Sequence, residues 1–325
     1  MAYNGGYNNT HRAFLQALLA RQVMTYEEAK PLIAAIETAH DDSRPRLAED
    51  VSQPDFDNYV EAVSTHISPF DFEIRHTLHQ QTKQRVYALV NTTSDPLTQM
   101  ATIHTADEIA FVKRVLDAMF ETYNAMRAEV MALTSMQAVR LAKPPHPGDA
   151  RRESGTQSQA SNAGLTIAQA EKVLRDLVHE NWFELSRNGF YSLSPRALIE
   201  LRDWLVETYN GQPEQDDDDD GEDVVVQQIK LCQACRDIVT VGQRCPNLRC
   251  AARLHSHCVQ MMWRTQGGQE QCPQCRTAWA EPPPVGEKAA RPRKSSVGNG
   301  TARTGRRSTG SARNDVSADD GAEDE

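Results

Sequence analysis

The sequence predicts a mainly α-helical fold with small β-hairpins, in which two modules of helices and a hairpin precede a small metal-binding module. Two observations support this order. Amphipathic helical spacing followed by short alternating strands occurs twice in residues 11–211. All seven cysteines then lie between Cys232 and Cys275. An odd number of cysteines arranged in short pairs favours thiolate metal ligands over a disulfide framework.

Length and composition are those of a globular protein. The 325 residues are enough for about two domains of ~150 residues each, and 39% hydrophobic with 25% charged residues exclude a wholly disordered or fibrous chain. No apolar run approaches the ~20 residues of a membrane-spanning helix, and residues 1–9 lack the charged and apolar regions of a secretory signal. We therefore expect an intracellular protein without membrane association.

The first module is expected at residues 11–142, after a disordered start at residues 1–10. Apolar residues at helical spacing mark three helices, and the second begins at Thr25, which forms a capping-box pattern with Glu28. Two alternating strands follow, the second at residues 86–90. Three helices followed by a two-stranded hairpin is the order of a winged helix, and further helical spacing continues to the end of this module.

A second winged helix is expected at residues 165–211, after a Pro-, Ser- and Gly-rich flexible linker at residues 143–164. Thr166 and Gln169 form a capping box at the start of its helix. A hairpin follows, in which Asn188-Gly189 is the strongest short turn signal because both positions tolerate positive φ.

Charge is distributed unevenly along the chain. Residues 214–223 carry eight acids and no base, so we expect a solvated acidic linker at residues 212–228, with a nucleic-acid decoy as the bolder interpretation. The tail at residues 281–325 is predicted to be disordered. Eight basic and no acidic residues between Lys288 and Arg313 are compatible with a nuclear-localisation or loose nucleic-acid segment, and equally with plain solvated disorder.

The metal-binding module is expected at residues 229–280 and contains eight ligands in four short pairs. Zinc takes four ligands tetrahedrally, so four pairs make two closed sites with no position left for a reactive water. About fifty residues bury too little apolar surface to fold alone, so two zinc ions are expected to be the main stabiliser. The ligands are Cys232, Cys235, Cys245, Cys250, His255, Cys258, Cys272 and Cys275.

Spacing alone leaves the pairing of these ligands open. A cross-braced arrangement would join Cys232 and Cys235 with the pair His255 and Cys258 at one zinc, and the remaining four cysteines at the other. His257 is the competing histidine. Because it is adjacent to Cys258, its side chain is expected to point away from the same metal, which favours His255 as the ligand.

The ligand order resembles the C4HC3 variant RING and, by order alone, the PHD finger. PHD fingers usually place an aromatic residue two positions before the seventh ligand, where this chain has Glu270. RING modules that bind ubiquitin-conjugating enzymes show an apolar residue between the first two ligands, an apolar helix after the sixth, a proline after the seventh and often a basic residue after the eighth. The matching residues are Ala234, Met262 with Trp263, Pro273 and Arg276.

A wider resemblance covers residues 11–279. It is carried by the zinc module after two winged helices and by residues 11–16 (HRAFLQ), residues 87–91 (YALVN), residues 170–174 (AEKVL) and Trp182. These features resemble the non-structural maintenance of chromosomes element 1 family, the RING subunits of the structural-maintenance-of-chromosomes five-six complex. The resemblance implies a nuclear protein of DNA repair and recombination that binds a MAGE-type subunit and a kleisin subunit and promotes ubiquitin transfer.

The leading hypothesis is a RING-type ubiquitin-protein ligase. If all seven cysteines hold zinc, none can carry a ubiquitin thioester, so the module would orient a charged conjugating enzyme for direct transfer to lysine. The resemblance implies that Arg276 orients ubiquitin, and that Ala234, Met262, Trp263 and Pro273 contact the enzyme. For Met262 and Trp263, packing within the module is an equal alternative.

Two other hypotheses remain. The first is a non-catalytic subunit that binds the MAGE-type partner and kleisin, favoured by the small Ala234. The second is a DNA-binding winged helix. The helix at residues 167–178 carries two basic and two acidic residues, so its charge is nearly balanced. Specific DNA readout by this helix is therefore not expected. Weak, non-specific DNA contact by the zinc module or the tail stays open.

Overall fold

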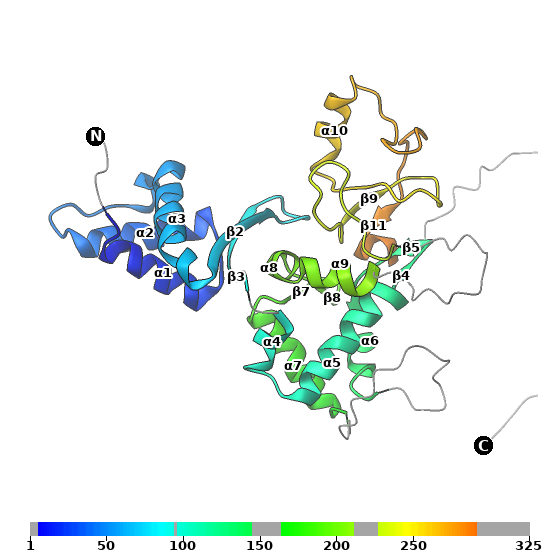
Figure 1. Cartoon of the computed structure of the whole chain (residues 1–325), viewed down its shortest axis with the longest axis horizontal. Coiled ribbons are helices and arrows are strands. Elements are labelled where there is room, and N and C mark those ends of the chain that lie inside the picture. Colours follow the sequence, from blue (N-terminus) through cyan, green and yellow to red (C-terminus); the bar gives the residue numbers. More distant parts are fainter. Residues whose placement is uncertain (1–5, 94–95, 145–163, 211–226, 291–325) are drawn as a thin grey trace, which may run out of the picture. The chain divides into compact units, whose positions relative to one another are not determined.

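The structure is a computed structural model that describes residues 6–93, 96–144, 164–210 and 227–290 (Figure 1). The predicted 143–164 linker and the predicted acidic linker fall almost entirely outside these residues, as do residues 291–325 of the predicted tail. Within the described residues, every helix is too short or too polar to span a membrane.

The first winged helix packs three helices against a three-stranded antiparallel sheet of order β1-β3-β2. Helix α1 already begins at Asn9, within the predicted disordered start. Two short 3-10 turns, Ala48–Asp50 and Ser68–Phe70, flank α3. The elements are α1 (Asn9–Arg21), β1 (Val23–Thr25), α2 (Tyr26–His40), α3 (Gln53–Ile67), β2 (Phe72–Leu78) and β3 (Arg85–Asn91).

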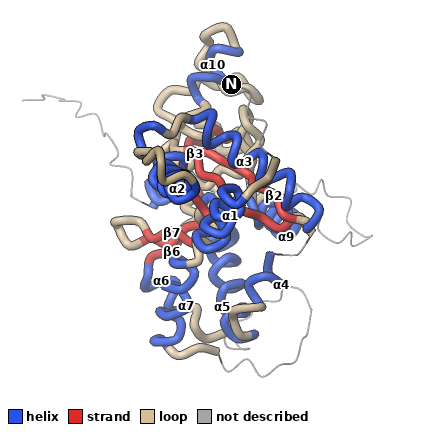
Figure 2. Tube along the Cα trace, turned by 90° about the vertical axis from the view of Figure 1, so that its left-hand side faces the viewer, coloured by secondary structure: helices blue, strands red, loops and turns tan. Residues whose placement is uncertain are grey.

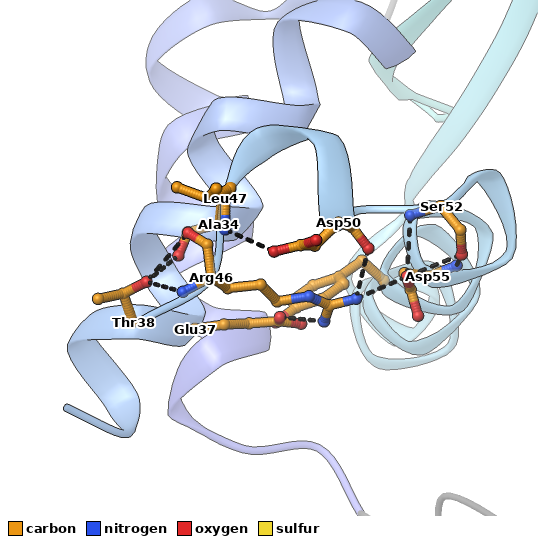
Figure 3. A network of polar contacts seen from close by, with 9 residues as sticks. Ala34, Glu37, Thr38, Arg46, Leu47, Asp50, Ser52 and Asp55 are labelled. Carbon is orange, nitrogen blue, oxygen red and sulfur yellow. Dashed lines mark hydrogen bonds and ion pairs between the residues drawn. The ribbon is translucent and has the colours of Figure 1, made fainter. Parts of the chain in front are cut away.

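Local polar contacts set where these elements begin. The predicted capping box of α2 is confirmed, since Glu28 N donates to Thr25 Oγ1 at 3.3 Å and Thr25 N donates to Glu28 Oε2 at 2.8 Å. The loop between α2 and α3 is held by Arg46, which contacts Glu37 and donates to Asp55 Oδ2 at 2.8 Å (Figure 3). These contacts bring α2 and α3 together, so that their apolar faces meet one core.

The core of this first module is aromatic. Phe56 is fully buried, and its ring lies 6.1 Å from that of Phe14 and 4.8 Å from that of Tyr87, both in edge-to-face geometry. These three rings come from α3, α1 and β3. They therefore join the helices to the sheet.

The second winged helix contains more of the chain than the sequence indicated. Strand β6 pairs antiparallel with β8, and the buried face of α5 packs in the same core as α7. Figures 1 and 2 show α5, α6 and α7 side by side. The elements are α4 (Pro96–Ala101), α5 (Ala106–Asp117) continued by a π turn (Ala118–Thr122), β4 (Asn124–Ala125), β5 (Ala128–Glu129), β6 (Leu133–Thr134), α6 (Ser135–Arg140), α7 (Ile167–His179), β7 (Phe183–Leu185), β8 (Phe190–Leu193), α8 (Pro195–Glu200) and α9 (Arg202–Asn210).

The structure thus differs from the predicted domain boundaries at residues 142 and 165. Residues 106–140, which were predicted to belong to the first winged helix, supply the first helices and a strand of the second. Helices α6 and α7, which precede and follow residues 145–163 in the chain, pack in this one core. Hydrophobic periodicity predicts where a helix lies, but it does not predict which strand a short segment such as β6 will pair with.

The hairpin of the second winged helix turns differently from the expectation as well. Gly189 N donates to Ser186 O at 2.9 Å, and of the Asn188-Gly189 pair only Gly189 has positive φ, at 78°. This geometry is a type I turn closed by a left-handed glycine, the common three-residue alternative to the two-residue turn. The strands that it joins are those predicted.

The zinc module has a sheet of order β10-β9-β11 and one helix. Its elements are β9 (Gly242–Arg244), β10 (Arg253–Leu254), α10 (Val259–Thr265), β11 (Pro284–Val285) and a 3-10 turn (Glu287–Ala290). Strand β11 lies beyond the predicted end at residue 280, so the ordered module includes the start of the predicted tail. Gly242 has no room for a side chain, because a Cβ would lie 2.4 Å from Leu254 O.

One continuous core joins the second winged helix to the zinc module. It contains Leu205 and Tyr209 of α9 together with Ile229, Val239 and Leu254 of the zinc module, all buried. Tyr209 also donates to Asp117 Oδ1 at 2.8 Å. The zinc module is therefore packed as part of a larger body.

A pH-dependent contact joins the first two modules. His79 Nε2 lies 3.1 Å from Glu184 Oε1, and the hydrogen bond to Glu184 raises the pKa of His79 although burial opposes it. A raised folded pKa gives stabilisation that is complete below the unfolded value near 6.5 and is lost as pH rises through the folded value. We expect Glu184→Gln to lower the thermal unfolding temperature at about pH 6 and to have no effect at about pH 8.5. An equal effect at both pH values would contradict this assignment.

Candidate metal centre

Two short loops of similar geometry present four of the cysteines. Arg236 N donates to Cys232 O and Arg276 N donates to Cys272 O, both at 2.9 Å. Arg236 and Arg276 have φ of 68° and 59°, the left-handed conformation that closes each Cys-x2-Cys loop. The spacing of two residues therefore lets both sulfurs of a loop face one point.

The eight predicted ligands form two groups, each with its ligand atoms within 4.8 Å of one another. In the second group, Sγ of Cys245 lies 3.5 Å from Sγ of Cys275, and Sγ of Cys250 lies 3.6 Å from Sγ of Cys272. A tetrahedron with zinc–sulfur bonds of about 2.3 Å has edges of roughly 3.8 Å, so four sulfurs at this spacing fit one zinc ion. The groups are Cys232, Cys235, His255 and Cys258, and Cys245, Cys250, Cys272 and Cys275.

This grouping is the cross-braced arrangement, in which the first and third ligand pairs share one ion. His255 is the histidine of the first group. Its Nδ1 lies 3.2 Å from Cys235 Sγ, while its Nε2 contacts Ile238 O at 3.1 Å. A hydrogen bond from Nε2 to a carbonyl leaves the Nδ1 lone pair for the metal. His257 stacks on the ring of His255 at 5.0 Å and belongs to neither group.

Hydrogen bonds to Thr277 lower the pKa of Cys275 to about 6, whereas burial raises the pKa of Cys250 and of Cys258 to about 11, so the latter two thiols are neutral at pH 7 when no metal is bound. A thiolate is the metal ligand, and zinc binding must therefore release protons. With four protein ligands each, both sites are of the closed, structural kind.

Comparisons with known proteins agree with this architecture. Residues 11–201 match the family described as "Nse1 non-SMC component of SMC5-6 complex", and residues 232–275 match a RING-like domain. The chain belongs to the Nse1 family. Human "Non-structural maintenance of chromosomes element 1 homolog" is 22% identical over 275 residues, covering 85% of each chain. The Schizosaccharomyces pombe protein is 22% identical over 284 residues, covering 86% of this chain and 96% of its own.

A solved structure shows the same fold. A chain of an "Nse1-Nse3-Nse4 complex" superposes with a TM-score of 0.60 at 21% sequence identity, covering 85% of this chain and 98% of the solved one. The likeness in fold therefore covers most of both chains.

The residues suggested for enzyme binding lie on the zinc module of this Nse1-family chain. Ala234, Met262 and Trp263 are partly buried, and all three pack against the core. The Trp263 ring meets that of Trp279 edge to face at 5.8 Å. Pro273 is half-buried, whereas Arg276 is exposed. Each of the three apolar residues thus packs inward and keeps some surface in solvent.

One polar cluster beside the second zinc site was not predicted from the sequence. Glu129 of β5 is 2% exposed and accepts from Arg253 Nε at 2.6 Å and from Lys230 Nζ at 2.9 Å. Burial alone would raise the pKa of Glu129, but the hydrogen bond and charge of Arg253, aided by Lys230, lower it. Partners more than a hundred residues apart leave no local signal in the sequence.

Proposed function

We propose that this chain is a RING-type ubiquitin-protein ligase subunit of the SMC5-6 chromosome-maintenance complex, acting in the nucleus in DNA repair and recombination. The cross-braced RING-like zinc module in a member of the Nse1 family carries this proposal. The same family relationship supports a MAGE-type subunit and a kleisin subunit as its partners, since a solved relative is named as an Nse1-Nse3-Nse4 complex.

The proposed mechanism is transfer by orientation, without a covalent intermediate. All seven cysteines belong to the two ligand groups, so no thiol is left to accept ubiquitin. The chain would instead hold a charged conjugating enzyme on Ala234, Met262, Trp263 and Pro273, with an acceptor lysine attacking the thioester directly. The exposed Arg276, which directly follows Cys275, would hold ubiquitin in the reactive pose.

The test is the rate at which a panel of ubiquitin-charged conjugating enzymes discharges to free lysine, with the purified chain alone and with its MAGE-type partner. We expect acceleration, and we expect Arg276→Ala to slow discharge at least about tenfold because ubiquitin loses its orientation. Arg236→Ala is the matched control, since Arg236 is exposed and occupies the same left-handed position in the first loop. Both variants should retain two zinc ions by mass spectrometry.

An unchanged rate with Arg276→Ala would remove Arg276 from the mechanism. No acceleration across the panel, with the partner bound and both zinc ions present, would instead support the alternative function of a non-catalytic assembly subunit.

A surface groove favours that alternative. A groove of about 1270 Å³ between α6, α7 and the β7–β8 hairpin is lined by the exposed apolar side chains Met136, Ile167 and Leu185. Exposed apolar surface of this kind is typical of protein contacts. By contrast, Lys172 of α7 is paired with Asp176 at 2.8 Å, so part of the basic charge of this helix is already balanced by an acid on the same helix.

A further inference from the structure

The tip of the β2–β3 hairpin of the first winged helix contacts the zinc module. Gln80 in this tip is half-buried, whereas its neighbour Gln81 is exposed. The side chain of Gln80 donates from Nε2 to Ile238 O at 2.8 Å. Its Oε1 accepts from Val241 N at 2.7 Å and from Thr240 N at 3.1 Å. Both ends of one side-chain amide are therefore bound to the main chain of the zinc module.

The main-chain groups that Gln80 binds lie in a buried segment of the zinc module. Ile238 is 2% exposed and Thr240 is 4% exposed. Buried main-chain groups need hydrogen-bond partners from the protein, because an unpaired one loses its bonds to water without replacement. Gln80 supplies such partners to both polar types, as a donor to a carbonyl and as an acceptor for two amides. The hairpin tip thus stabilises residues 238–241 through a side chain from another module.

The carbonyl of Ile238 also connects the hairpin to the first zinc site. Its oxygen accepts from Gln80 Nε2 and from His255 Nε2, the latter at 3.1 Å. A carbonyl oxygen has two lone pairs and can accept both bonds at once. The bond to His255 orients the ring so that Nδ1 faces the metal position. Gln80 therefore holds in place the acceptor that orients a zinc ligand.

The hairpin tip has a second anchor beside Gln80. His79 Nε2 lies 3.1 Å from Glu184 Oε1 of β7. The first winged helix has a core of its own, whereas the second winged helix shares a core with the zinc module. The tip is thus bound, through polar contacts, to a body whose core it does not share.

We propose that Gln80 is a positioning residue of the first zinc site, which fastens the β2–β3 hairpin to residues 238–241 and, through Ile238 O, holds His255 in its ligand orientation. The hairpin contact and the first metal then stabilise each other. Loss of the contact weakens retention of the first metal, and by linkage loss of that metal weakens the contact. This coupling concerns how the modules of the chain are joined and does not depend on ubiquitin transfer.

Hydrogen exchange in the zinc-loaded full chain tests the hairpin contact. Gln80→Met keeps the length of the side chain and removes both of its hydrogen-bonding groups. We expect it to speed exchange at the Thr240 and Val241 amides at least about tenfold, because both donate to Gln80 Oε1. Gln81→Met, at the exposed neighbouring position, is the matched control and should leave both amides within about twofold. Unchanged exchange at both amides in Gln80→Met would overturn the proposal.

Metal release separates positioning of His255 from a general loss of stability. The full chain loaded with cobalt(II) reports the two sites separately, because a Cys3His site and a tetrathiolate site have different absorption spectra. We expect Gln80→Met to speed release from the Cys3His site to excess chelator at least about threefold, below the roughly 10–100-fold typical of a direct partner of a ligand. The tetrathiolate site should stay within about twofold. Equal acceleration at both sites would contradict the positioning role.

A second variant, Gln80→Asn, tests whether the reach of the side chain matters. Asparagine keeps the amide but is one methylene shorter, so it cannot bind Ile238 O and the Val241 amide together. We expect the same changes in exchange and in metal release as for Gln80→Met. Parent behaviour of Gln80→Asn in both measurements would refute the proposal. Unchanged protection of the separate first core, recorded in the same exchange experiment, verifies that each variant is folded.

Discussion

Replacing Cys272 with serine is expected to abolish binding of the second zinc ion and to unfold the zinc module. Structural zinc contributes an apparent ~10–16 kcal/mol in small zinc-binding peptides, which is comparable with the ~5–15 kcal/mol that stabilises a whole domain. Cys272 is 1% exposed and shares its site with three other cysteines, so its loss leaves that group with three thiol ligands. Intact-mass measurement of zinc content and hydrogen exchange over residues 229–290 would record the loss.

Ser256→Ala is the control for this substitution, since Ser256 is exposed in the same module and belongs to neither ligand group. The first winged helix should keep its protection in both variants because it has a separate core. Two zinc ions in the Cys272→Ser chain would contradict the ligand assignment.

Substituting alanine for Phe56 is expected to destabilise the first winged helix by about 3–5 kcal/mol, the usual cost of removing a fully buried phenylalanine. The ring joins α1, α3 and β3 through its contacts with Phe14 and Tyr87, so its loss opens a cavity that several elements share. All four tryptophans lie at residue 182 or later, and tryptophan fluorescence will not report this change. Hydrogen exchange over residues 9–91 as a function of denaturant is the suitable measurement.

Phe70→Ala removes the same side chain from an exposed position, since Phe70 is 71% exposed, and should change stability by less than about 0.5 kcal/mol. Equal destabilisation by the two substitutions would show that Phe56 is not the centre of this core. Unfolding of the zinc module in Phe56→Ala would show that the modules do not fold independently.

Features that depend on residues a few positions apart could be predicted from the sequence alone. The capping boxes at Thr25 and Thr166 are present, because an N-cap hydroxyl and a residue three positions later interact within one turn. The hairpins and the short Cys-x2-Cys loops also agree with the prediction, because they too depend on residues only a few positions apart. Ligand order also allowed the cross-braced two-zinc fold to be predicted, although spacing alone did not decide the pairing.

Features that depend on residues far apart in the chain follow from tertiary packing. Leu133 pairs with Tyr191 in the second winged helix, and Pro284 pairs with Gln243 beyond the predicted end of the zinc module. Glu129 meets Arg253 across 124 positions. Such pairings are selected by which apolar faces and charges can be buried together, and that choice is made by the whole fold rather than by any local propensity. The sequence therefore identified the metal ligands, while only the packed structure revealed the carboxylate and cations beside them.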